Sequence, residues 1–62
     1  MTELAPIGVW HPTKLPSGQW VVSRNVMRGR NLHREVMIGD RGAFVRFDTE
    51  AMADLMAGKK NR

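Results

Sequence analysis

The sequence predicts a small α+β domain of two layers, in which an antiparallel meander of three to four strands is packed by one C-terminal helix. Three observations favour this fold. Turn-forming residues divide the first 47 residues into short segments rich in Val, Ile, Trp, Phe and Leu, a composition typical of strands. After Phe47 the hydrophobic period lengthens to that of a helix. A chain of 62 residues is one domain at most, and its core is thin.

The first strand is expected to be short and to lie at an edge of the sheet. It covers residues 7–11, because Pro12 limits its length and cannot donate to a central ladder. A tight turn at Pro16-Ser17-Gly18 follows, in which proline presets φ and glycine takes the fourth position. The loop length leaves the register of this strand against the next one open.

Two further turns, at Arg28-Gly29-Arg30-Asn31 and Gly39-Asp40-Arg41-Gly42, set the register of the remaining strands. Folding the chain about Gly29 and about Asp40-Arg41 brings apolar residues of three segments to one sheet face. The second of these folds sets Ile38 opposite Ala43. That face consists of Trp20, Val22, Val26, Leu32, Val36, Ile38, Ala43, Val45 and Phe47. The opposite face is mostly polar and holds Val21, Ser23, Asn25, His33, Glu35, Met37, Phe44 and Arg46. We therefore expect one face to meet the helix and the other to meet solvent.

The helix is expected to begin at Asp48, a good N-cap, with Thr49 as the alternative, and to end at Gly58. Because a helix of about ten residues is not stable alone, its apolar stripe must lie on the sheet. This stripe consists of Met52, Leu55 and Met56. The whole chain, 1–62, is expected to be one domain with an ordered core over about residues 7–58 and flexible ends at 1–5 and 59–62.

Several classes of site are not expected. The chain has no cysteine, and His11 and His33 form no metal-ligand spacing, so we expect no metal and no cofactor. No carboxylate pair stands near a histidine, and no glycine-rich phosphate loop precedes a helix, so the chain is predicted not to be an enzyme. No apolar run approaches the roughly 20 residues of a membrane span, and residues 1–6 lack the basic region of a signal peptide. We expect a cytoplasmic protein.

The basic residues are concentrated in the first half of the chain. Between Leu4 and Arg34 there is no Asp and no Glu, whereas the same stretch carries five Lys or Arg residues and both histidines. The formal net charge of the chain is +4. Such a distribution is typical of a protein with a polyanionic partner, usually nucleic acid. A small protein kept dispersed by its charge is the alternative.

Two places concentrate these cations. The predicted register sets Arg24 opposite Arg34, and like charges so placed require an anion such as a phosphate or a partner carboxylate. An internal Arg34–Asp48 ion pair is the alternative. The second place is the basic hairpin tip, a two-stranded ribbon that fits the DNA major groove, unless it is merely a solvated turn. The candidate nucleic-acid-binding or partner-binding residues are Arg24, Asn25, Arg28, Arg30, Asn31, His33, Arg34 and Arg46.

The two tryptophans are candidate stacking platforms for single-stranded bases. Trp20 falls among the apolar positions, which favours the core. The role of Trp10 stays open. Asn25 and His33 are predicted to face each other across the exposed sheet face, where they read base edges or form an ordinary polar pair.

A resemblance to a known kind of domain rests on four short motifs. These are Gly8-Val9-Trp10, Gly18-Gln19-Trp20-Val21-Val22, Arg28-Gly29-Arg30 and a Thr49-led helix with Ala53. In topology the chain resembles the three-stranded-sheet-plus-helix domains of the AP2-like and integrase arm-binding type. The resemblance implies that the sheet lies in the DNA major groove and that Arg24, Asn25, Arg30, His33 and Arg46 form the reading surface. The chain departs from this pattern in its extra turn at 39–42 and in the spacing between strand and helix.

The sequence therefore predicts a small, basic, noncatalytic protein that binds nucleic acid, with DNA favoured, through an Arg-rich β-hairpin. The alternative is a small phage or mobile-element accessory protein that binds and modulates a host protein through an acidic patch. Phe44, Met37 and Val21 would then be its hydrophobic anchors. The oligomeric state is unknown, and a homodimer formed by edge-strand pairing is a third possibility.

Overall fold

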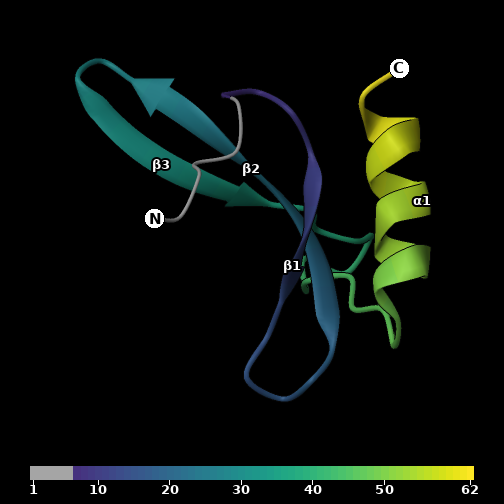
Figure 1. Cartoon of the computed structure of the whole chain (residues 1–62). Helices are drawn as coiled ribbons and strands as arrows, with labels where there is room; N and C mark the ends of the chain where they lie inside the picture. The colour runs from purple at the N-terminus through teal and green to yellow at the C-terminus, as the bar shows by residue number, and fades with distance from the viewer. Residues whose placement is uncertain (1–6) are drawn as a thin grey trace.

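The computed structural model describes residues 7–62 and confirms the predicted fold class (Figure 1). Three antiparallel strands form a meander in the order β1-β2-β3, and helix α1 lies beside β1 and β2. The elements are β1 (His11–Lys14), β2 (Trp20–Arg28), β3 (Asn31–Val36) and α1 (Glu50–Lys60). The predictions for residues 1–6 lie outside the described residues.

Strand β1 begins where the first strand was expected to end. The prediction of a strand over residues 7–11 is wrong, because β1 includes Pro12 and pairs with β2 over its whole length. Pro12 is tolerated because β1 is an edge strand, as predicted. Upstream of β1, Ile7 forms an isolated parallel bridge with Asn25 of β2.

Strands β2 and β3 pair one residue away from the predicted register. They are joined by a two-residue turn of Gly29 and Arg30, in which Gly29 has a φ of 64°. A left-handed glycine at the first of two loop positions is typical of the type II′ hairpin turn. The prediction centred the turn on Gly29 and therefore placed Arg24 opposite Arg34, whereas Arg24 lies opposite Glu35. The observed register thus replaces a pair of like charges by a pair of opposite charges.

This shift exchanges the two faces of β3, because side chains alternate with a period of two. Met37, which follows β3, packs against the core, although it was assigned to the solvent face. Leu32, assigned to the core, is 49% exposed. The face predicted to be solvated is also buried at the centre of β2, where Val21 and Ser23 are 3% and 0% exposed.

The segment between β3 and α1 forms no regular strand, so the sheet within residues 7–62 has three strands. The predicted turn at 39–42 is present, since Gly42 N donates to Gly39 O at 3.0 Å. Beyond it, isolated bridges join Ile38 to Phe44 and Phe47 to Trp20. The predicted pairing of Ile38 with Ala43 is therefore also wrong by one residue. Phe47 therefore pairs with the first residue of β2, Trp20, at the end of β2 that does not pair with β3.

The core lies between the sheet and α1. It consists of Trp10, Val22, Ala53 and Ala57, with Trp20, Met37, Phe47 and Met56 packed against them. Trp20 is thus confirmed as a core residue, and the open question about Trp10, which is 8% exposed, is answered in the same way. Within the described residues, no helix is long and apolar enough to span a membrane.

Helix α1 uses the alternative N-cap and a different buried face from the predicted one. Thr49 Oγ1 accepts a hydrogen bond from Met52 N at 3.3 Å. The sheet-facing side is built on Ala53 and Ala57, which are one turn apart and fully buried. Met52 and Leu55 are 54% and 66% exposed, so two of the three predicted stripe residues are wrong. Small alanine side chains let the helix approach Trp10 closely, and Met52 and Leu55 then face outward while Met56 packs at the edge of the core.

The predicted helix end at Gly58 is wrong as well. Gly58 lies inside α1, which continues to Lys60 and is capped by Asn61. Asn61 N donates to the carbonyl oxygens of Ala57 and Lys59, so the last turn remains hydrogen-bonded. The flexibility expected for residues 59–62 stays a prediction.

Candidate functional site

The outer end of the β2–β3 hairpin projects from the body of the fold (Figure 1). Strand β1 accompanies β2 only as far as Ser23, and the bridge from Ile7 reaches Asn25. Beyond that point β2 and β3 pair only with each other within the described part of the chain. We call residues 26–34 the hairpin arm. Residues 27–34 of the arm are all exposed, so both of its faces are accessible to a partner.

The hairpin arm is strongly cationic. Arg28, Arg30 and Arg34 are all exposed, and the arm contains no Asp and no Glu. The one ion pair found within residues 7–62 joins Arg24 to Glu35, outside the arm. The three guanidinium groups of the arm therefore have no carboxylate partner in the described structure. Guanidinium groups in this state are available to bind phosphate or carboxylate oxygens.

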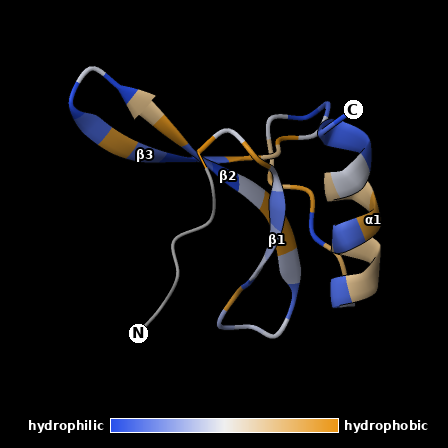
Figure 2. Cartoon of the chain, turned by 45° about the horizontal axis from the view of Figure 1, so that its top comes forward, coloured by the Kyte–Doolittle hydropathy of each residue, from blue (hydrophilic) through white to orange (hydrophobic). Residues whose placement is uncertain are grey.

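The cations of the hairpin arm are distributed over both of its faces. The observed register pairs Arg28 with Asn31 and Val26 with His33 on the face that continues toward α1. Arg34 belongs to the opposite face, where Met27 and Leu32 are paired, and Arg30 occupies the turn. Five of the candidate residues thus lie on one projection, namely Arg28, Arg30, Asn31, His33 and Arg34, and their role in binding stays a prediction. Figure 2 shows that its hydrophilic segments are interrupted by hydrophobic ones.

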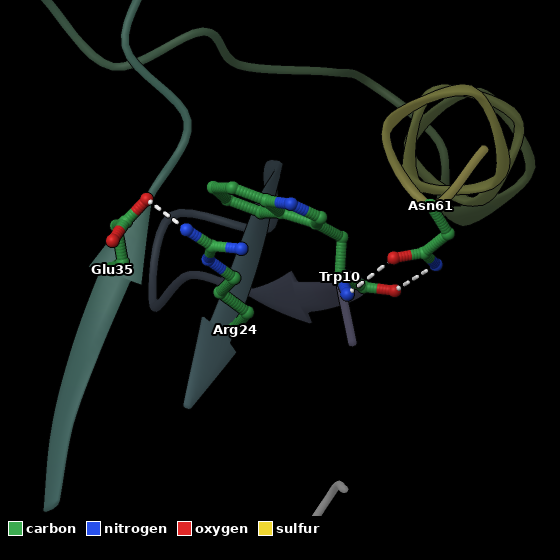
Figure 3. Close-up of polar contacts among 4 residues, drawn as sticks. All are labelled: Trp10, Arg24, Glu35 and Asn61. Carbon is green, nitrogen blue, oxygen red and sulfur yellow. Dashed lines mark hydrogen bonds and ion pairs between the residues drawn. The ribbon is translucent and has the colours of Figure 1, made fainter. Parts of the chain in front are cut away.

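Arg24 does not belong to this cationic projection. Its Nη2 donates to Glu35 Oε1 at 3.0 Å, and its guanidinium carbon lies 4.6 Å from the centroid of the Trp10 ring (Figure 3). Neither the predicted Arg24–Arg34 anion site nor the alternative Arg34–Asp48 ion pair is found in the described structure. The guanidinium group of Arg24, at the base of the hairpin, is thus already engaged by Glu35 and by the Trp10 ring, unlike those of the arm.

Asn25 and Arg46 do not add to the exposed surface of the hairpin arm, Asn25 because it is buried and Arg46 because it is distant. Asn25 is only 8% exposed and lies opposite Arg34, so the predicted Asn25–His33 pair is wrong. Arg46 is exposed but precedes Phe47, which is bridged to Trp20 at the far end of β2. At about 3.3 Å per residue, that end lies roughly 25 Å from the hairpin turn. These two residues do not contribute to a continuous surface with the arm.

The cluster around Trp10 was not predicted from the sequence. Asn61 Oδ1 accepts from Trp10 N at 2.8 Å, and Asn61 Nδ2 donates to Trp10 O at 3.0 Å (Figure 3). Lys60 Nζ lies 4.8 Å from the centroid of the same indole ring, so two cations contact it. Two hydrogen bonds and a ring contact thereby fasten the end of α1 to the segment before β1. No local pattern in the sequence identifies an asparagine with this role.

The described residues offer no evident site for metal chemistry. No group of three or more His, Cys, Asp or Glu side chains within residues 7–62 is arranged to hold a metal ion. The expectations that the chain is not an enzyme and needs no cofactor stay predictions.

The comparisons with known proteins leave the hairpin arm as the main guide to function. The chain matches no family model, no curated protein and no solved structure. The topological resemblance to DNA-binding domains with three strands and a helix therefore has no support from a solved structure.

Proposed function

We propose that this chain is a nucleic-acid-binding protein that binds duplex DNA through its hairpin arm. The observation that carries the proposal is the projection of Arg28, Arg30 and Arg34 on one two-stranded ribbon without a carboxylate partner in the described structure. A ribbon of two strands fits a groove of DNA, and arginines on both of its faces reach the phosphates on either side. The sheet and α1 serve as the platform that holds the ribbon.

The number of free arginines sets the expected salt dependence. If the three arginines each neutralise one phosphate, log Kobs falls with log salt at a slope of about −2.7. The affinity then decreases about 40-fold between roughly 50 and 200 mM salt. This electrostatic contribution is largely independent of base sequence, and we expect weak discrimination between duplexes of different sequence.

A salt titration with matched variants tests the proposal. Arg28→Gln with Arg30→Gln removes two cations from the arm, and the slope for a fluorescent duplex is expected to drop by about 1.8. Lys14→Gln with Arg41→Gln removes the same net charge from exposed positions outside the arm and should leave the slope nearly unchanged. Equal effects of the two double variants, or an affinity that does not fall with salt, would refute specific use of the arm.

A second candidate function is binding to a host protein, and one observation favours it. Ile38 and Phe44 are bridge partners after β3 and are 58% and 52% exposed, which makes an apolar projection outside the hairpin arm. Of the anchors expected for this function, Met37 and Val21 are instead taken into the fold. Ile38→Ser with Phe44→Ser should abolish capture of a host protein from nuclease-treated lysate while leaving duplex binding intact. Loss of duplex binding in that variant would contradict the view that the hairpin arm and the apolar projection are separate binding surfaces.

A further inference from the structure

We infer that the hairpin arm inserts Met27 and Leu32 as an apolar wedge between base pairs and thereby kinks the duplex. This inference rests on the proposed function and concerns the same projection. Beyond binding, it states that the arm bends the DNA. It also names the kind of site that the protein prefers, which is a duplex whose stacking is already weakened.

The first observation is the placement of the two apolar side chains. Met27 and Leu32 are directly opposite each other, and they form the last cross-strand pair on their face before the turn. They are the only apolar residues of the arm on that face, and they are 47% and 49% exposed. A solvated hairpin end needs no such pair, since cross-strand polar residues would serve equally well.

The second observation is the charge around the pair. Arg34 follows on the same face, two residues from Leu32, and Arg30 lies in the turn beyond. No acid stands within residues 26–34. An apolar pair bordered by unpaired cations suits an anionic partner that also offers apolar surface. A duplex has both, because its phosphates border stacked base faces.

The physical mechanism follows from this combination. Arginines hold the backbone on either side while methionine or leucine side chains enter a base step, and the unstacked step bends. Flexible methionine and leucine side chains are among those that proteins use in this way. The energetic cost of unstacking is lower where bases are already mismatched, so such sites should be preferred.

The test measures bending and binding separately. A duplex of about 25 base pairs with a dye at each end is titrated with the wild-type chain at low salt, and energy transfer between the dyes reports the bend. We expect the ends to approach as the complex forms. A duplex with a central two-base mismatch should bind about tenfold more tightly than the matched duplex.

The matched variant is Met27→Thr with Leu32→Thr, which keeps residues that favour strands. It should retain the salt slope of the wild type, lose the approach of the dyes and lose the preference for the mismatch. Circular dichroism and gel filtration of the free variant establish that it is folded and monomeric. Arg28→Gln with Arg30→Gln should instead weaken binding to both duplexes alike.

Three results would overturn the inference. One is binding by the wild type without any approach of the dyes, which would leave the proposed function standing. Another is equal bending by the threonine variant. The third is self-association of the free wild type that the threonine variant abolishes, since Met27 and Leu32 would then contact a second copy. Absence of any duplex binding would refute the proposed function itself.

Discussion

Asn61 is expected to be the residue whose loss most clearly detaches α1 from the sheet. Its side chain makes two hydrogen bonds to the backbone of Trp10, at 2.8 and 3.0 Å in a partly buried setting. At about 1 kcal/mol for each net hydrogen bond, Asn61→Ala should lower the free energy of unfolding by about 2 kcal/mol. Each kcal/mol shifts Tm by about 4–8 °C in a domain of this size, so we expect a decrease of roughly 10 °C or more.

Thermal unfolding followed by far-UV circular dichroism measures this effect. Arg62→Ala is the matched control, because it lies next to Asn61, is exposed and contributes no side-chain hydrogen bond in the described structure. The control should unfold within about 2 °C of the wild type, as surface substitutions usually do. If Asn61→Ala unfolds at the same temperature as the control, the two hydrogen bonds of Asn61 are not needed. Packing of Trp10 against the alanines of α1 would then be sufficient to keep the helix on the sheet. Below its transition, Asn61→Ala should bind duplex DNA as the wild type does, since the hairpin arm is separate.

Three further predictions concern the fold. Thr49→Ala should cost about 1 kcal/mol because it removes the N-cap bond to Met52 N, and Thr49→Ser should restore it; denaturant titration measures both. A double-mutant cycle on Arg24 and Glu35 should give a coupling of at most about 1 kcal/mol, because their side chains are 32% and 37% exposed, and a much larger coupling would indicate a stronger electrostatic role. Ala57→Leu should lower the free energy of unfolding by about 1–3 kcal/mol, because Ala57 is buried against the sheet. Leu55→Ala should change it by less than about 0.5 kcal/mol, because Leu55 is exposed. A larger effect of Leu55→Ala than of Ala57→Leu would mean that the face of α1 with Leu55 meets the sheet.

The register error shows where reasoning from the sequence failed in the candidate site. The residues of the turn were identified correctly, but its length was not. A two-residue loop with glycine first is the common form, and it would have placed Arg24 opposite Glu35. The apolar face that included Leu32 appeared consistent because both turns were shifted by one residue in the same way. Consistency between two turns is therefore weaker support than the charge pairing across one of them.

The helix illustrates a different limit. Its start and approximate length follow from the N-cap and from the change in hydrophobic period. Its buried face does not, because Met52 and Leu55 are more hydrophobic than Ala53 and Ala57 and yet are exposed. Which side of a short helix meets the sheet depends on how closely the backbones approach and on the bulk of the opposing Trp10. Neither quantity is a local property of the helix sequence.

The sequence by itself determined the class of the fold, the positions of the turns and the absence of acids in the basic half of the chain. These depend on residue types close together in the chain, such as glycine at left-handed positions or alternating apolar residues. Only the tertiary structure decided which arginines remain available. Arg24 is paired with Glu35 and contacts the Trp10 ring, whereas Arg28, Arg30 and Arg34 lie on the hairpin arm, beyond the bridge from Ile7 to Asn25, and have no carboxylate partner within residues 7–62. The difference arises from strand register and from packing between distant segments, which bring together residues that no local pattern relates.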